Sequence, residues 1–243
     1  MTSRPEMSIS FLAPTNLTAY KRGIPATEQT SIPIIFHDAM IVRNDVFVVE
    51  QRVPAENEFD SDDSRSCHFV AYDSIKRTDG SVTPKVPVGT IRIVPFPHAP
   101  HPTPGKSYWD GVPEGEEPNT SNSSRFTYVD RATDLHNGRE PYVKFGRLAV
   151  QKNYRGKGVA GQLTRAALEW LAQNPTAFDA ALPPANEGDE GQLKFKGLVC
   201  AHAQVQAKAS WARWGFVVDE GMGTWNEEGI SHVGMFQRVP IAE

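Results

Sequence analysis

The sequence predicts one α/β domain: a mixed, centrally antiparallel sheet of about six or seven strands with helices on both faces. Two patterns support this prediction. Short segments of alternating or β-branched residues, typical of strands, are interleaved with segments whose apolar residues recur at helical spacing. The chain has 243 residues, of which 39% are hydrophobic and 22% charged, so one large core is available and wholesale disorder is excluded.

The expected elements follow in the order strand, helix, strand, strand, strand, helix, strand, helix, strand. Residues 36–49 place Phe36, Ala39 and Met40 at the spacing of an amphipathic helix, and a second apolar helical stripe begins at Val159. Strands are expected at 9–12, 67–72, 88–94, 142–150 and 197–203, a helix at 204–214, and a terminal β pair at 216–218 and 232–237.

Two stretches rich in turn residues are expected to be insertions. Residues 95–118 hold seven of the nineteen prolines, and a polar run follows at 119–124. Because proline removes ladder hydrogen bonds and breaks helices, we expect neither strand nor helix in 95–124, and 95–140 as a whole is expected to be an insertion, either an ordered loop or disordered. The second insertion is 174–191. The domain itself is expected over 31–243, after an N-terminal extension of residues 1–30.

Composition excludes several classes of function. The net charge is −4, and basic clusters with interleaved aromatic residues are absent, so nucleic acid is not an expected partner. No stretch approaches the roughly 18 apolar residues of a membrane span, and the N-terminus lacks the apolar segment of a secretory signal. Two cysteines and scattered histidines do not form a metal-ligand pattern. A cytoplasmic protein is expected, with the nucleus left open.

Residues 147–160 place a strand, a glycine-bearing loop and a helix start in direct succession. A helix N-terminus offers N–H groups and the positive end of the helix dipole. Glycine lets the backbone approach an oxyanion closely, and Arg155 and Lys157 add positive charge, so this loop is expected to bind a phosphate or pyrophosphate. Residues 156–161 also match the dinucleotide pattern G-x-G-x-x-G, but the next strand does not end in the acidic residue that this pattern requires.

Arg155-x-x-Gly158-x-Ala160, preceded by Leu148-x-Val150, resembles the coenzyme A signature of the GNAT family of N-acetyltransferases. Segments at 43–51, 58–60, 203–204 and 228–235 resemble the ElaA-like branch of that family. The resemblance implies the GNAT acyl-CoA acyltransferase fold, with acetyl-CoA or coenzyme A as co-substrate. It also implies that the strand backbone pairs with pantetheine in a gap between the fourth and fifth strands, while the loop amides hold the pyrophosphate. The residues expected to bind the cofactor are Leu148, Val150, Arg155, Gly156, Lys157, Gly158, Val159 and Ala160.

The resemblance further implies transfer of an acetyl group from acetyl-CoA to a primary amine by direct attack in a ternary complex. The acceptor is expected to be a small molecule or a peptide, and the oligomeric state is left open, with a homodimer as one option. Two alternatives remain: a non-catalytic acyl-CoA-binding module, or a nicotinamide-dependent oxidoreductase.

One departure from the family concerns the general acid. Family members often carry a tyrosine, which protonates the leaving thiolate, where this chain has Trp211. Indole cannot supply that proton. A thiol with a pKa of about 8.5 can leave as thiolate without help, so Trp211 indicates a mechanism without a tyrosine acid.

Attack by an amine requires a base, because an ammonium group with a pKa of about 10 must first lose a proton. The candidate bases are Glu50, Glu58, His202 and His232. Each has a structural alternative: an exposed glutamate at a helix end, a residue of a solvated loop, or a histidine satisfied within the sheet. The acidic stretch 56–63, which contains Glu58, is expected to be a solvated loop, with attraction of a cationic amine as its functional alternative.

Overall fold

The computed structural model describes residues 6–74, 85–116, 127–182 and 194–241. The chain divides into two compact units. Unit 1 comprises residues Met1–Val94 and Gly146–Ala167, and unit 2 comprises Pro95–Phe145 and Leu168–Glu243. Strand β6 and helix α2 each run from one unit into the other.

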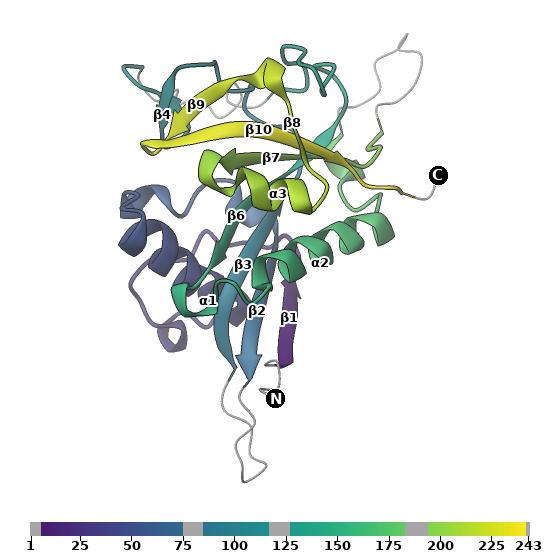
Figure 1. The fold of residues 1–243 in the computed structure, drawn as a ribbon. Helices are drawn as coiled ribbons and strands as arrows, with labels where there is room; N and C mark the ends of the chain where they lie inside the picture. Colours follow the sequence, from purple (N-terminus) through teal and green to yellow (C-terminus); the bar gives the residue numbers. More distant parts are fainter. Residues whose placement is uncertain (1–5, 75–84, 117–126, 183–193, 242–243) are drawn as a thin grey trace. The chain divides into compact units, whose positions relative to one another are not determined.

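Unit 1 is built on an antiparallel sheet (Figure 1). Strand β1 (Glu6–Leu12) pairs along its whole length with β2 (Cys67–Ser74), which pairs with β3 (Val86–Val94). The part of β6 (Tyr142–Val150) that starts at Gly146 continues this unit beside β3. β1 falls within the segment predicted as an N-terminal extension, so that segment contributes a strand to the sheet.

Helices cover both faces of this sheet. Helix α1 (Ile34–Arg43) begins directly after Pro33, and its Ala39 packs against Val70 of β2. The first turns of α2 (Val159–Gln173) approach β3 so closely that a Cβ on Gly89 would lie 2.9 Å from Leu163 Cδ1. Gly89 pairs with Ala71, whose side chain points away from the Val70 face, because side chains alternate along a strand. The two helices therefore lie on opposite faces, as predicted.

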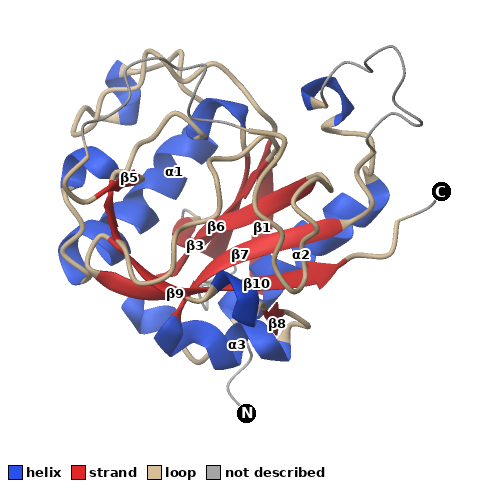
Figure 2. Ribbon diagram, turned by 90° about the horizontal axis from the view of Figure 1, so that it is seen from above, coloured by secondary structure: helices blue, strands red, loops and turns tan. Residues whose placement is uncertain are grey.

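Unit 2 contains a mixed sheet around a long C-terminal strand. The start of β6 runs parallel to β7 (Leu198–Gln204), and β7 is antiparallel to β10 (Ile230–Arg238). β10 also pairs with β8 (Val217–Val218) and with β9 (Thr224–Glu227). Helix α3 (Lys208–Arg213) follows β7 and packs against β7 and β8 (Figure 2).

The core of unit 2 joins residues from β6, β7, β9 and β10. Its buried members are Tyr142, Leu198, Cys200, Met222, Trp225 and Phe236, with Tyr108 packed against them. Short 3₁₀ helices occupy the connections in both units: Ala26–Glu28, Ala55–Asn57, Asp63–Arg65, Lys152–Tyr154, Asp179–Ala181, Val205–Ala207 and Glu220–Met222.

The structure corrects the interpretation of residues 95–140. This stretch contains β4 (Ser107–Trp109) and β5 (Val112–Pro113), and β4 runs parallel to β9. The prolines flank the short strands or end one of them at an edge, where the sheet tolerates a missing donor. The described residues thus form ten strands instead of six or seven. Residues 117–126 and 183–191 of the two expected insertions lie outside the described residues.

Candidate functional site

The loop that joins β6 to α2 lies in unit 1 and has the form expected of an anion-binding loop. After β6 ends at Val150, the Gln151 N–H donates to the Val88 carbonyl, and one 3₁₀ turn leads to Gly156 and Gly158. These glycines have φ values of 75° and 84°, in the left-handed region that side chains disfavour. Helix α2 starts directly afterwards at Val159, so its first N–H groups project at the end of the loop.

The space around these glycines is open among the described residues. A Cβ on Gly156 would meet no atom within 4 Å, and one on Gly158 would meet only the Gln162 side chain, at 3.9 Å. Packing against the protein therefore does not require glycine here. Glycine permits the backbone conformation and leaves room for a ligand to approach the backbone.

The Arg155 side chain, which extends from this loop, donates hydrogen bonds to Glu50 and to the backbone of Val150. Its Nη1 and Nη2 donate to the two carboxylate oxygens of Glu50, at 2.6 and 2.7 Å, and its Nε donates to the Val150 carbonyl at 3.0 Å. Lys157, another cation of the loop, lies over the ring of Tyr154, 4.8 Å from its centre. The hydrogen bond from Arg155 holds the pKa of Glu50 below its usual range, so Glu50 is an ionised ion-pair partner here and a poor proton acceptor.

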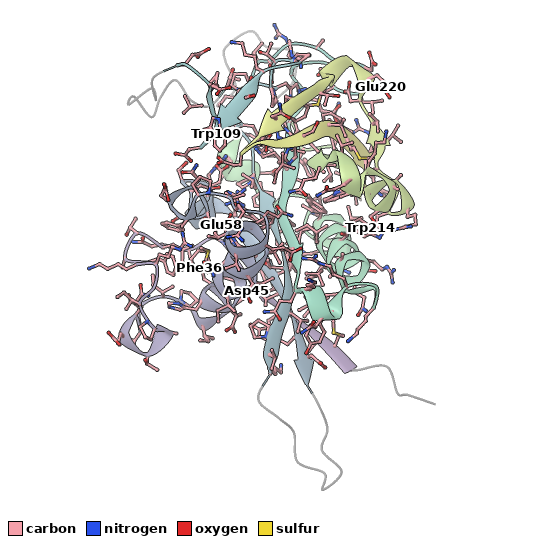
Figure 3. The ribbon with its side chains drawn as sticks, turned by 60° about the vertical axis from the view of Figure 1, so that its left-hand side comes forward. Phe36, Asp45, Glu58, Trp109, Trp214 and Glu220 are labelled. Atoms are coloured by element: carbon pink, nitrogen blue, oxygen red, sulfur yellow. The ribbon has the colours of Figure 1, made fainter. Side chains whose placement is uncertain are left out.

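The acidic stretch 56–63 is not a solvated loop, and this prediction was wrong. Glu58, Asp60 and Asp63 meet three guanidinium groups, those of Arg43 in α1, Arg92 in β3 and Arg147 in β6. The negative charges of the three carboxylates and the positive charges of the three guanidinium groups are equal in number. Figure 3 shows Glu58 near Phe36 of α1. Because buried charges are stable only when paired, the stretch anchors the loop to the sheet and presents little free negative charge to an amine.

Glu58 itself is only 2% exposed and is bound from two sides. It accepts a hydrogen bond from Arg43 Nε at 2.6 Å, and Arg147 Nε lies 3.2 Å from the same oxygen. The Glu58 backbone carbonyl also accepts from Arg43 Nη2. These contacts give Glu58 a place in the ion-pair cluster of unit 1.

Arg147 lies where β6 leaves regular strand geometry. The described pairs between β6 and β7 run from Tyr142 with Leu198 to Phe145 with Ala201. Arg147, two residues after the last pair, has a φ of 51°, which is rare for a residue other than glycine. The guanidinium contacts with Asp60 and Glu58 hold the strand in this conformation. The half-buried Leu148 and Val150, predicted to pair with pantetheine, follow this irregularity in unit 1.

In unit 2 the two predicted histidines both lie against the ring of Trp225. His202 in β7 is 4.9 Å from the Trp225 ring between centres, and His232 in β10 is stacked on the same ring at 6.5 Å. The His232 Nδ1 donates to the Ile230 carbonyl at 2.7 Å. A carbonyl only accepts, so this bond places the proton of a neutral His232 on Nδ1.

His202 is paired with a carboxylate that the sequence analysis did not identify. Its Nδ1 lies 2.7 Å from Glu227 Oε1, and the same oxygen accepts from Trp225 Nε1 at 2.7 Å. Because the carboxylate only accepts, His202 carries its proton on Nδ1 and keeps the lone pair on Nε2, as a general base must. The His202 side chain is 16% exposed.

The charges of this pair follow from burial and proximity. Burial lowers the pKa of His202, and Glu227 opposes this only in part, so the imidazole is neutral at neutral pH. Burial alone would raise the pKa of Glu227, but the adjacent His202 and the Trp225 N–H outweigh it and keep the carboxylate ionised.

The sequence feature that could have identified Glu227 is the two-residue turn that follows it. Glu228 and Gly229 both have positive φ, 51° and 76°, which defines the tight turn between β9 and β10. Glutamate is not among the residues typical of the first turn position, so this hairpin was not expected. The turn brings Trp225 opposite His232.

Trp211 does not take the place of an acid. It is buried in α3, edge-on to Phe216 at 4.9 Å and to Trp214 at 5.4 Å between ring centres. Its contacts are those of a core aromatic residue, which agrees with the expectation that this chain lacks the tyrosine acid.

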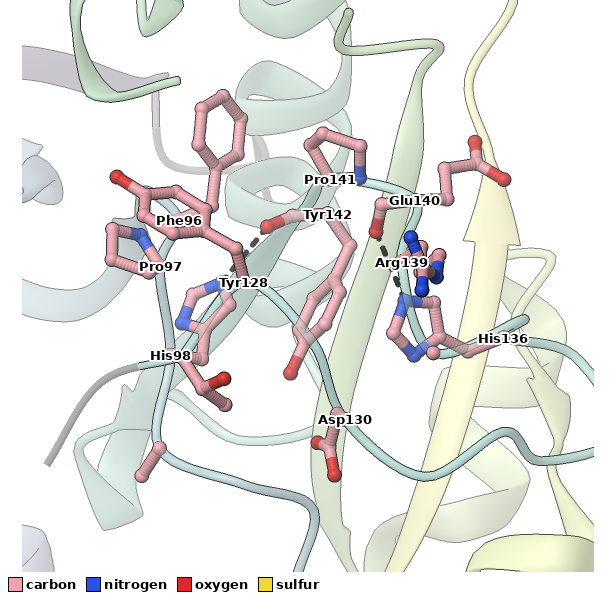
Figure 4. A pocket seen from close by; sticks show the side chains of 13 residues that line it. Phe96, Pro97, His98, Tyr128, Asp130, His136, Arg139, Glu140, Pro141 and Tyr142 are labelled. Carbon is pink, nitrogen blue, oxygen red and sulfur yellow. Dashed lines mark hydrogen bonds between the residues drawn. The ribbon is translucent and has the colours of Figure 1, made fainter. Parts of the chain in front are cut away.

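A separate pocket in unit 2 contains none of the predicted site residues. Its lining includes His98, Asp130, His136 and Tyr142 (Figure 4). His98 Nε2 bonds to the Tyr142 carbonyl at 2.8 Å and His136 Nε2 to the Glu140 carbonyl at 2.9 Å. These histidines therefore bind the backbone at the start of β6 and just before it.

In the described ranges no three histidine, cysteine, aspartate or glutamate side chains are grouped so that they could bind a metal ion. Among the helices of the same residues, none has the length and apolar character needed to cross a membrane.

Comparisons with known proteins found one matching family model and solved structures that resemble this chain. The model of the Acetyltransferase (GNAT) family matches residues 38–188, more than half of the chain. A Lactobacillus plantarum protein named as an N-acetyltransferase is similar over 96% of this chain and 98% of its own, with 20% identity and a TM-score of 0.51. An acyl-CoA N-acyltransferase from Pseudomonas aeruginosa covers 96% of this chain and 99% of its own, with 17% identity and a TM-score of 0.45.

Proposed function

Because the chain belongs to the GNAT acetyltransferase family and has the acyltransferase fold expected from its sequence, we propose that it transfers an acetyl group from acetyl-CoA to a primary amine. Membership establishes an acyl-CoA N-acyltransferase fold. We further propose that the acyl group is acetyl, that the acceptor is a primary amine, and that the chain belongs to the ElaA-like branch of the family.

The observation that carries the proposal is the loop at 151–158. Two glycines with positive φ, open space around them and the start of α2 form a cradle of backbone N–H groups for a diphosphate. We assign the binding of CoA to the residues predicted from the sequence, which lie in this loop and in the adjoining ends of β6 and α2: Leu148, Val150, Arg155, Gly156, Lys157, Gly158, Val159 and Ala160.

For the chemical step we assign the base to His202, with Glu227 as its positioning residue. In the reaction the amine nitrogen attacks the thioester carbonyl, the C–N bond forms, and the C–S bond breaks with departure of the thiolate. The proton of the amine passes to His202 Nε2. Among the four candidates only His202 has its other ring nitrogen fixed by a carboxylate, whereas Glu50 and Glu58 are bound to arginines.

The proposal is tested by binding and by turnover. Isothermal titration should show that CoA and acetyl-CoA bind and that NADH does not. Addition of a suitable amine to the protein and acetyl-CoA should then release free CoA thiol. Binding without thiol release over a broad amine panel would favour the non-catalytic module, and binding of NADH alone would contradict the assignment of the loop.

A further inference from the structure

The exposed Arg155 of the loop proposed to bind CoA is hydrogen-bonded to the protein itself. Its two terminal nitrogens donate hydrogen bonds to the two carboxylate oxygens of Glu50, and its Nε donates to the Val150 carbonyl. A guanidinium fork fits a carboxylate and a phosphate in the same bidentate manner. The Glu50 carboxylate therefore occupies the part of Arg155 that a phosphate would use.

The fold places Glu50 there through an unusual helix. α1 continues into a π-helix, η2 (Asn44–Glu50), in which the Gln51 N–H reaches back to the Val46 carbonyl. Val46 packs with Ala149 of β6, one residue before the end of that strand. Such π-helical segments are rare and often lie at functional positions.

A second contact fixes the same segment to the start of the loop. Asp45 Oδ2 accepts from the Gln151 side chain at 3.0 Å. η2 thus contacts the loop at its first residue through Asp45 and at its arginine through Glu50. Only the second contact engages a positive charge.

We propose that Glu50 is an internal competitor for the phosphate groups of the acyl-CoA: it holds Arg155 while the loop is empty, and it must release or share this arginine when the cofactor binds. This inference rests on the proposed function, because it assumes that the loop binds CoA. Glu50 sets the affinity for the cofactor and thereby favours its exchange between turnovers.

The exposure of Arg155 and Glu50 indicates how much the loss of Glu50 should change the affinity for CoA. The Arg155 and Glu50 side chains are 41% and 39% exposed, and ion pairs between such exposed groups are weak. A ligand can therefore displace Glu50 at modest cost. Removal of the Glu50 charge should lower the dissociation constant for CoA by about two- to ten-fold.

The experiment measures CoA binding by titration calorimetry, with Glu50→Gln as the test and Asp45→Asn as the matched control. Asp45→Asn removes the same charge from the same segment, but its partner is the neutral Gln151. Glu50→Gln should tighten CoA binding and Asp45→Asn should change it less than about twofold. In an Arg155→Ala background, Glu50→Gln should lose its effect, since the shared arginine is absent.

The outcomes separate this inference from the proposed function. If the wild-type chain does not bind CoA, the proposed function fails, and this inference with it. If the wild-type chain binds CoA but Glu50→Gln weakens binding or leaves it unchanged, only the role of Glu50 is overturned. If Glu50 is instead the base, Glu50→Gln will lower kcat without tightening CoA binding.

Discussion

At His202 a single hydrogen bond determines which ring nitrogen carries the proton. Glu227 accepts a hydrogen bond from the Nδ1–H group of His202, and the Trp225 N–H donates to the same carboxylate oxygen. Replacement of Glu227 by glutamine removes the negative charge that stabilises the protonated imidazole once His202 Nε2 has accepted the proton of the amine. We expect Glu227→Gln to lower kcat by about 10²-fold or more and to leave the dissociation constant for CoA unchanged.

The pH profile distinguishes positioning from mere support of the fold. Glu227 raises the pKa of His202 against the effect of burial, so its loss should move the acidic limb of kcat/KM to lower pH. Glu228→Gln is the control, since Glu228 lies in the same turn and accepts from the Asp110 N–H instead. Near-normal kcat in Glu227→Gln would contradict the positioning role of Glu227.

Trp211 makes a second prediction at the scale of one residue. If the thiolate leaves without an acid, Trp211→Tyr should raise the rate little, because the side chain lies among core aromatic residues. The alkaline side of the wild-type kcat/KM profile should show no acid with a pKa of about 9–10. A large gain in rate for Trp211→Tyr would show that a proton donor is missing at this position.

At the scale of the element, the loop depends on the backbone conformation of Gly158. Gly158→Ala forces a Cβ into the left-handed region, which costs about 1–2 kcal/mol, and places a methyl group where the diphosphate is proposed to approach. CoA binding should fall by at least about tenfold while the fold survives. The measurement is titration with CoA, together with urea unfolding.

Gly23→Ala serves as the matched control for backbone strain. Gly23 lies in the same unit and has a φ of 76°, and its added Cβ would meet no atom within 4 Å, where that of Gly158 would meet only the Gln162 side chain at 3.9 Å. The two variants should lose similar free energies of unfolding, and only Gly158→Ala should lose CoA binding. Equal CoA binding in both variants would contradict the assignment of the loop.

Much of each unit could be predicted because local periodicity specifies it. The strand at 142–150 and the helix start at Val159 appear as predicted, since alternation and a helical stripe are local patterns. The acidic stretch was misinterpreted because its partners Arg43, Arg92 and Arg147 are 15 to 89 residues distant from the acids they bind. Glu227 was missed for a related reason: its partner belongs to another strand, and the intervening turn lacks a typical sequence.

At the scale of the whole molecule, buried titratable groups in both units predict how stability depends on pH. Burial lowers the pKa of His68 in unit 1 and of His101 in unit 2 to about 4. Both histidines bind protons more readily when the chain is unfolded, where the pKa is about 6.5. The free energy of unfolding should therefore fall by about 1–3 kcal/mol per histidine as the pH falls from 6.5 to 4.

Below pH 4 the carboxylates of the ion-pair cluster add a second loss. Burial would raise the pKa of Asp63, but Arg43 and Arg92 outweigh it and bring the pKa to about 2. A carboxylate whose pKa is lower in the folded chain than in the unfolded chain stabilises the fold at pH values above the unfolded pKa of about 4. This contribution is lost as the pH falls towards 2. Urea unfolding between pH 8 and 3 measures both losses, and stability that stays constant from pH 7 to 4 would contradict the first.

The central claim is that this chain moves an acyl group from acyl-CoA directly to an amine. Mass spectrometry of reactions with acetyl-CoA and a panel of small amines, polyamines and peptides tests it most directly. We expect an acetylated amine, an equal amount of free CoA, no acetyl group on the protein, and loss of the product with Gly158→Ala and with Glu227→Gln. Acetylation of the protein before the amine is added, or CoA binding without any acetylated product across the panel, would contradict the claim.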